Sequence, residues 1–169
     1  YEILDGDWSS DVCSSDLSPA TAIYRADYEA PAWWIDTVDL TFDLDPAKTL
    51  VLSKMRVRRN PEVPAQALRL DGDELNLARV MVNGGGPSVK MEGHQLVLEN
   101  LPEGNEPVEL EIFTTCAPIK NTKLMGLYVT ADTFFTQCEA EGLRRITYFL
   151  DRPDVMALDT ATPPACHAL

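Results

Sequence analysis

The stretch PAWWIDTVDLTFDLDPAKTLVLSKMRVRR, residues 31–59, decides the fold class. Over residues 38–44, apolar and polar side chains alternate, which is typical of a strand with one face buried. The dipeptide Asp45-Pro46 ends this run, because proline cannot donate a ladder hydrogen bond and disfavours helix at the preceding residue. The alternation resumes over residues 51–57. The stretch therefore predicts two antiparallel strands joined by a short turn.

The same kind of pattern recurs along the rest of the chain. Short β-prone runs occupy residues 67–70, 75–82, 89–91, 96–98 and 108–113. Glycine, proline and asparagine lie between them and supply the positive or fixed φ angles of tight turns. Strands about 8 to 12 residues apart, without a convincing long amphipathic helix, predict an all-β sandwich or open barrel of mostly antiparallel strands.

A run of three glycines, residues 84–86, lies between two of these β-prone segments. A phosphate-binding loop needs a strand, a glycine-rich turn and then the N-terminus of a helix. Here Pro87 and another β-like run follow the glycines. We therefore predict a hairpin turn at this position.

The composition excludes several classes of function. Acidic residues outnumber basic ones 27 to 14, and this net charge of −13 argues against a nucleic-acid-binding surface. The sequence lacks both a run of roughly 18 apolar residues and a secretory signal, so we expect a cytoplasmic protein. The cysteines are Cys13, Cys116, Cys138 and Cys166. None forms a C-x-x-C pair, so we expect them to be reduced and mostly structural.

The two ends of the chain lack the pattern of the interior. Residues 1–17, YEILDGDWSSDVCSSDL, have neither a helix nor a strand period, and they carry five acidic residues and no basic one. Residues 7–17 resemble a translated sequencing-library adapter, which makes residues 1–17 an artefact; a genuine Ser/Asp-rich leader is the alternative. Residues 158–169, with two prolines and no period, are either a loop or a frameshifted or truncated end. The domain is accordingly assigned to residues 20–157.

The candidate for chemistry is TQCEAEG, residues 136–142. If this stretch is extended, Gln137 and Glu139 project from the same face. A carboxylate beside an amide can receive an ammonium group through charge-assisted hydrogen bonds. On pattern alone, however, a solvent-facing acidic turn is the simpler interpretation, with Glu139 or Glu141 paired to a nearby arginine.

Other candidate residues have simpler interpretations. With only two histidines, His94 and His167, the sequence shows neither a two-histidine zinc motif nor a Ser-His-Asp triad. His94 lies in the turn-like EGHQL and is interpreted as a solvated loop residue. The DRPD motif at 151–154 is interpreted as a turn fixed by proline, with a local ion pair. The chain is not expected to catalyse a reaction alone.

Residues 136–155 resemble the N-terminal domain of the aminopeptidase N family of zinc metallopeptidases (gluzincins), in its bacterial alanyl aminopeptidase branch. The motifs that carry the resemblance are TQCEAEG at 136–142, Arg144, ITY at 146–148 and DRPDV at 151–155. The likeness begins at Tyr24 and runs to Met156. Leu143 replaces the usual phenylalanine, and after Ala157 the sequence leaves the family pattern.

The resemblance implies a β-rich saddle that packs against a thermolysin-like catalytic domain of the same polypeptide. Gln137 and Glu139 would hold the α-amine of a peptide substrate. The zinc-binding H-E-x-x-H, the G-x-M-E-N loop and the catalytic tyrosine are absent from this sequence, so we expect an incomplete N-terminal domain that binds no zinc and is inactive alone. The whole protein would be a zinc-dependent hydrolase that releases N-terminal residues in peptide catabolism. The rival hypothesis is a free-standing β-sandwich binding or interaction module without enzymatic activity.

Overall fold

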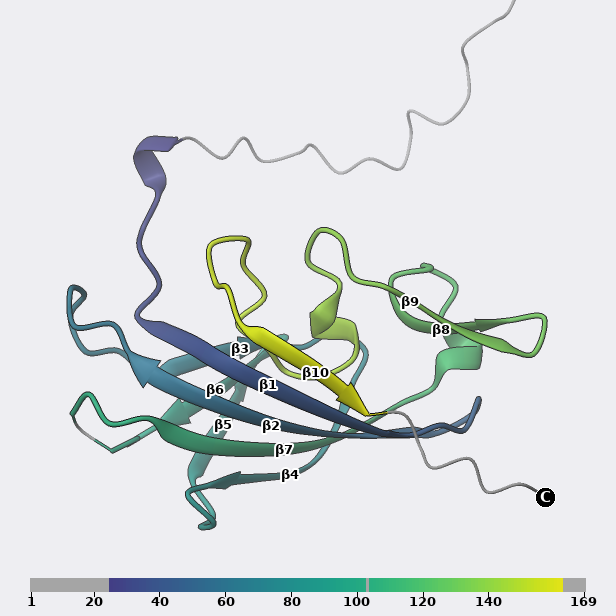
Figure 1. The fold of residues 1–169 in the computed structure, drawn as a ribbon, viewed down its shortest axis with the longest axis horizontal. Helices are drawn as coiled ribbons and strands as arrows, with labels where there is room; N and C mark the ends of the chain where they lie inside the picture. The colour runs from purple at the N-terminus through teal and green to yellow at the C-terminus, as the bar shows by residue number, and fades with distance from the viewer. Residues whose placement is uncertain (1–24, 103, 163–169) are drawn as a thin grey trace, which may run out of the picture.

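A computed structural model describes residues 25–102 and 104–162 (Figure 1). The predicted all-β fold is confirmed, because helical structure in this part of the chain is limited to three-residue 3₁₀ turns, none long enough to cross a membrane. The elements are η1 (Arg25–Asp27), β1 (Trp33–Asp43), β2 (Thr49–Arg59), β3 (Leu68–Asp71), β4 (Asn76–Val82), β5 (Ser88–Glu92), β6 (Gln95–Glu99), β7 (Val108–Cys116), η2 (Pro118–Lys120), β8 (Gly126–Thr130), β9 (Thr133–Gln137), η3 (Leu143–Arg145) and β10 (Leu158–Thr162).

The main layer is a five-stranded sheet in the order β10-β1-β2-β7-β4. Strands β1 and β2 pair antiparallel from Trp33 opposite Arg59 to Asp43 opposite Leu50, as the alternation in residues 31–59 predicts. Strand β7 lies between β2 and β4 and is antiparallel to both. Strand β10 is the exception, because it runs parallel to β1 along one edge of the sheet (Figure 1).

A smaller sheet of β3, β6 and β5 and a separate β8–β9 hairpin complete the architecture. The central strands of the large sheet bury every second side chain, such as Met55 on β2 and Ile112 on β7. Strands β3 and β6 contribute Leu70 and Leu96 to the same apolar cluster. The core is therefore formed between the two sheets, as in a sandwich.

One turn and one strand differ in detail from what the sequence predicts. The predicted glycine turn is present: Asn83 and Gly84 have φ of 49° and 78°, which suits a tight turn closed between Val82 and Gly85. Its flanking strands β4 and β5 do not pair with each other, however, because they belong to different sheets.

Residues 158–162 form strand β10 rather than a loop. Residues 1–17 and 163–169 lie outside the described residues, so the adapter interpretation and the origin of the tail stay predictions.

Candidate functional site

The β8–β9 hairpin positions Gln137. Its two-residue turn, Ala131-Asp132, has positive φ at both residues, which matches the right-handed twist of hairpin strands. The rings of Tyr128 and Phe135 stack across the strands with their centroids 5.7 Å apart. Gln137 is the last residue of β9, where the hairpin ends.

The condition that TQCEA is extended holds only as far as Gln137. The chain turns over residues 139–142, and the backbone N–H groups of Glu141 and Gly142 both donate to the Cys138 carbonyl, at 3.2 and 2.8 Å. The peptide bond between Glu139 and Ala140 is cis. The structure nevertheless brings the two predicted residues together, because the Gln137 side-chain amide donates to the Glu139 carbonyl at 3.5 Å. Both are exposed to solvent.

Gly142 allows the turn to fold back on the strand that precedes it. A Cβ atom at this buried position would lie 2.7 Å from both the Cys138 Cα and the Gln137 carbonyl oxygen. Side chains do not fit at that distance, so the backbone of residues 137–138 can approach only a glycine. The sequence gives no sign of this contact, because the glycine reads as an ordinary turn residue.

Arg144 also holds the turn, through hydrogen bonds to Asp151 and Glu141. Its backbone N–H and its Nε both donate to Asp151 Oδ2 at 3.0 Å, and its Nη2 donates to Glu141 Oε2 and to the Asp151 carbonyl at 2.9 Å. The predicted acid–arginine pair is therefore confirmed for Glu141. Within residues 25–102 and 104–162, the Glu139 carboxylate forms neither an ion pair nor a hydrogen bond. Of the two glutamates in this turn, only Glu139 has a carboxylate without a partner in this part of the chain.

Arg145 anchors the same region to the loop between β3 and β4. Its side chain is 7% exposed and forms ion pairs with Asp73 at 2.6 Å and Glu74 at 2.9 Å. The hydrogen bond from Arg145 is the main cause that lowers the pKa of Glu74. Gly126, which pairs with Gln137 across the hairpin, has φ of +74° and lies against the Arg145 backbone. The sequence pattern does not indicate this anchor, because the partners of Arg145 lie about 70 residues away.

Cys138 lies between the two predicted amine-binding residues. Although the residue is exposed, partial burial of its thiol, together with the charges of Asp151 and Asp159, raises the pKa of Cys138. The reactive form of a cysteine is the thiolate, so a raised pKa disfavours a nucleophilic role. The prediction of a structural cysteine fits Cys116 better, because that residue is buried in the core.

The DRPD motif forms the predicted turn and local ion pair. Arg152 donates from Nη2 to Asp154 Oδ2 at 2.8 Å. The motif also holds the N-terminal segment, which sequence reasoning missed: Arg152 donates to the Glu29 carbonyl at 2.7 Å, and the Tyr28 hydroxyl donates to Asp154 at 3.0 Å. These contacts are structural and do not involve Gln137 or Glu139.

His94 lies in the turn between β5 and β6, and its side chain is 83% exposed. Its Nδ1 is 3.9 Å from Asp73 Oδ1, so its interpretation as a solvated loop residue agrees with the geometry. Among the residues that the structure describes, no group of three or more histidine, cysteine or acidic side chains could hold a metal ion.

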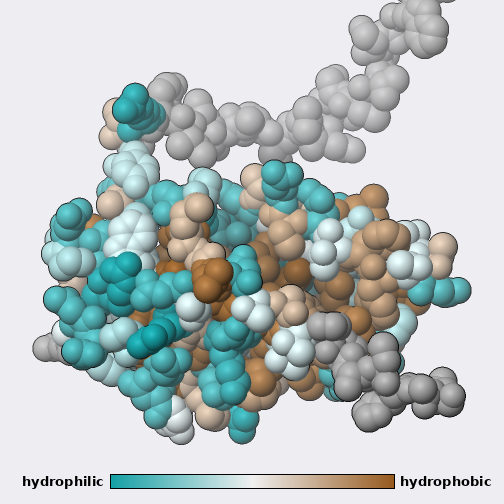
Figure 2. Space-filling model, viewed as in Figure 1, coloured by the Kyte–Doolittle hydropathy of each residue, from teal (hydrophilic) through white to brown (hydrophobic). Residues whose placement is uncertain are grey.

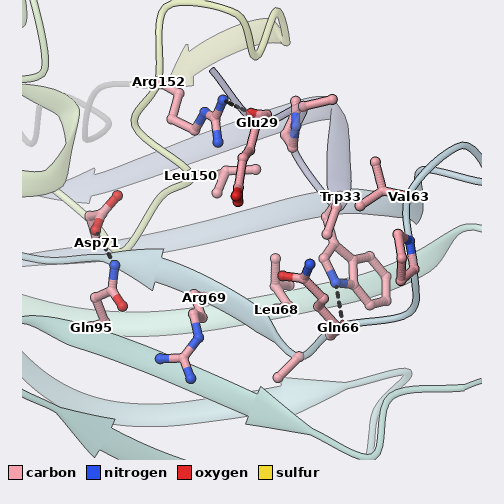
Figure 3. Close-up of a pocket in the computed structure, with 15 residues that line it drawn as sticks. Glu29, Trp33, Val63, Gln66, Leu68, Arg69, Asp71, Gln95, Leu150 and Arg152 are labelled. Carbon is pink, nitrogen blue, oxygen red and sulfur yellow. Dashed lines mark hydrogen bonds between the residues drawn. The ribbon is translucent and has the colours of Figure 1, made fainter. Parts of the chain in front are cut away.

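A hollow of about 530 Å³ lies away from Gln137 and Glu139 (Figure 3). It is bounded by the segment around Trp33, by residues 63–69 and by Leu150 and Arg152. Two of its polar side chains already have partners: the Trp33 indole donates to the Gln66 carbonyl at 3.0 Å, and the Gln95 amide donates to Asp71 at 2.9 Å. These two groups are therefore already engaged.

Comparison with known proteins shows to which family the chain belongs. No protein-family model matches the sequence. The chain is 47% identical over 137 residues to aminopeptidase N of Escherichia coli, and 41% identical over 140 residues to aminopeptidase N of Haemophilus influenzae. These matches cover 80% and 82% of this chain, but only 15% and 16% of the relatives. The chain thus spans about one sixth of their length.

Solved structures give the same result. The crystal structure of Legionella pneumophila aminopeptidase A in complex with aspartic acid matches with a TM-score of 0.74 and 30% identity, over 82% of this chain and 16% of that one. An M1 zinc metallopeptidase from Deinococcus radiodurans matches with a TM-score of 0.67 over 79% of this chain and 32% of that one; at 16% identity, this likeness shows the fold alone. Sequence and fold together identify the chain as part of the aminopeptidase N family, with the N-terminal β-sandwich domain of the M1 zinc aminopeptidases.

Proposed function

We propose that this domain holds the α-amine of the substrate in a zinc-dependent aminopeptidase that removes N-terminal residues from peptides. The observation that carries the proposal is the open carboxylate of Glu139, exposed on a braced turn beside Gln137, in a chain homologous to aminopeptidase N. The relatives in Escherichia coli and Haemophilus influenzae are aminopeptidases N, and the activity of the whole protein is proposed by homology.

An exopeptidase must recognise the free end of its substrate. A fixed carboxylate near the scissile bond selects chains that end in an ammonium group and sets which peptide bond lies in the reactive position. Glu139 supplies the charge, and the Gln137 amide oxygen supplies a further acceptor. We expect Glu139 to contribute more than Gln137, because its contact is between opposite charges.

The hydrolytic step is assigned to residues outside this sequence. Zinc held by those residues would supply the activation of water and the polarisation of the scissile carbonyl. The described residues offer no cluster of zinc ligands, and the sequence contains no H-E-x-x-H motif, so this chain is proposed to bind the amine without holding the metal or hydrolysing peptides by itself. The missing catalytic domain of the same polypeptide would supply both functions. We also propose a cytoplasmic location for the whole protein.

The surface near the site supports a contact with the rest of such a polypeptide. Figure 2 shows apolar residues gathered over the end of the molecule that carries β8 and β9. Ile119, Leu124 and Phe135 are 60%, 56% and 42% exposed there. Exposed apolar side chains beside a candidate site are typical of an interface.

The proposal is tested in the complete polypeptide with Glu139→Gln. We expect turnover of unblocked alanyl substrates to fall by about 100-fold or more, because a charged contact to the amine is lost from the transition state. Bound zinc should not change. Glu106→Gln, which removes an exposed carboxylate elsewhere, is the matched control. Near-normal turnover with Glu139→Gln would exclude Glu139 from the site.

The gene offers a second test. An H-E-x-x-H reading frame within a few hundred codons after Ala157 would support an aminopeptidase. A stop codon directly after it would favour the free-standing binding module.

A further inference from the structure

One arginine connects the turn that carries Glu139 to two other segments. The Arg144 side chain reaches Glu141 on the turn and both the carboxylate and the carbonyl of Asp151. The Arg144 carbonyl accepts a hydrogen bond of 2.8 Å from the backbone N–H of Asp73, in the loop after β3. Residues far apart in the sequence are therefore fixed relative to the turn by Arg144.

The contacts of Arg144 require a guanidinium group. Its Nε and Nη2 serve different acceptors at 2.9–3.0 Å, which the planar fork of an arginine allows and a single ammonium group does not. The Asp151 side chain is only 12% exposed, and Arg144 donates to it from both backbone and side chain. Removing the guanidinium would leave that nearly buried carboxylate with one donor fewer.

The position of Glu139 depends on the contacts of Arg144 with Glu141 and Asp151. The Glu139 carboxylate has no partner of its own within residues 25–102 and 104–162, so the backbone of the turn sets where it points. That backbone is short and closed by the two bonds to the Cys138 carbonyl. A displacement of Glu141 is therefore transmitted to Glu139 two residues away.

Arg144 also distinguishes the two glutamates of the turn. Glu141 is paired at 2.9 Å, whereas Glu139 remains open. A substrate ammonium group therefore meets one uncompensated carboxylate in the turn instead of two. This favours a single position for the amine.

We propose that Arg144 is a positioning residue for amine recognition: it holds the turn in place and neutralises Glu141, so that Glu139 alone receives the substrate ammonium. This inference rests on the amine-binding function proposed for Glu139. Arg144 itself does not contact the substrate.

The test uses the complete zinc-loaded enzyme and two inhibitors that differ only in the amine, alanine hydroxamate and propionohydroxamate. Because both carry the same metal-binding group, the ratio of their inhibition constants isolates recognition of the amine. We expect Arg144→Gln to lower this preference roughly 10-fold or more, as expected for a misplaced binding group. Arg144→Lys should fall between wild type and Arg144→Gln. Arg58→Gln, which removes an exposed arginine paired with Asp36 at 2.7 Å, should not change the ratio.

A double variant tests whether both residues act on one contact. Glu139→Gln with Arg144→Gln should show no lower preference than Glu139→Gln alone. If the fold decreases of the two single variants multiply in the double variant, Arg144 acts independently of Glu139, and this would overturn the inference. A lower melting temperature with an unchanged ratio for Arg144→Gln would show a merely structural role and would also overturn it.

The outcomes separate the inference from the function on which it rests. If Glu139→Gln lowers the ratio and Arg144→Gln does not, only the positioning role fails. If Glu139→Gln leaves the ratio unchanged, the amine-binding function fails, and the inference fails with it. Should Arg144→Gln not fold, Arg144→Lys decides, because a lysine keeps the positive charge beside Glu141 but cannot serve all the acceptors of the guanidinium; we expect a decrease of about two- to fivefold, and no decrease overturns the inference.

Discussion

The five-stranded sheet and the segment from β9 to η3 are held together by different interactions. Along β2 and β7, side chains alternate between buried and more exposed, and the buried ones are mainly aliphatic. Along β9, four of the five residues are exposed, and the turn that follows is fixed by Arg144, Arg145 and the close approach of Gly142.

This difference follows from what each region does. Apolar burial is non-directional and increases with area, so the sheet can spread its stability over many side chains. A site that receives a ligand must leave its groups open to solvent and cannot bury them. Directional contacts from a few residues replace burial there, and each of those residues has correspondingly more influence on the geometry.

The largest effect on stability is expected in the sheet. Ile112 is completely buried on β7, so Ile112→Ala should lower the free energy of unfolding by about 2–5 kcal/mol, through lost burial and the cavity that remains. Urea unfolding followed by circular dichroism measures this change. Ile112→Val, the matched control, should cost only about 0.5–1.5 kcal/mol. A loss below about 1 kcal/mol for the alanine variant would contradict the contrast between the regions.

A somewhat smaller effect is expected from Arg145→Met. The guanidinium is 7% exposed, but its partners Asp73 and Glu74 are 28% and 55% exposed. We therefore expect a loss of about 2–3 kcal/mol, below the roughly 3–5 kcal/mol of fully buried pairs, because water compensates the released carboxylates. The same unfolding measurement applies. If Arg145→Met were as stable as the wild type, apolar packing instead of ion pairing would hold this region.

Gly142→Ala tests the close approach in the turn. Its new Cβ would meet the backbone of residues 137–138, so we expect a cost of about 1–3 kcal/mol and a weaker preference for the amine-bearing hydroxamate in the complete enzyme. Gly86→Ala is the matched control, because no atom lies within 4 Å of a Cβ there. Equal behaviour of the two variants would remove the steric explanation.

The smallest effect concerns a surface carboxylate outside both regions. Hydrogen bonds from Lys90 and Arg69 lower the pKa of Glu92 from 4.5 to about 2. Glu92 therefore adds stability above about pH 4.5, and this contribution is lost as the pH falls towards 2. The difference in unfolding free energy between wild type and Glu92→Gln should shrink over that interval in an acid titration. A constant difference would show that the charge of Glu92 does not stabilise the fold.

The sequence predicts the sheet better than the site for a physical reason. Alternation within residues 31–59 is a local signal, and it correctly indicates β1, β2 and their antiparallel pairing. The bend after Gln137 is held by side-chain contacts that strand alternation does not encode, namely those of Arg144 with Asp151 and, across 72 residues, of Arg145 with Asp73. The identity of the site residues came from a resemblance, because the exposed pattern of TQCEAEG alone favours an ordinary acidic turn.

Strand β10 has a consequence for the order of events during synthesis. Thr37 on β1 pairs with Leu158, so about 120 residues separate β1 from the strand that covers its outer edge. At ~5–20 residues per second, a ribosome needs roughly 6–24 s to make that length. Throughout this interval the nascent chain carries an unprotected β edge, which is a template for pairing with other chains. Early protection of β1 by a chaperone would therefore favour correct folding.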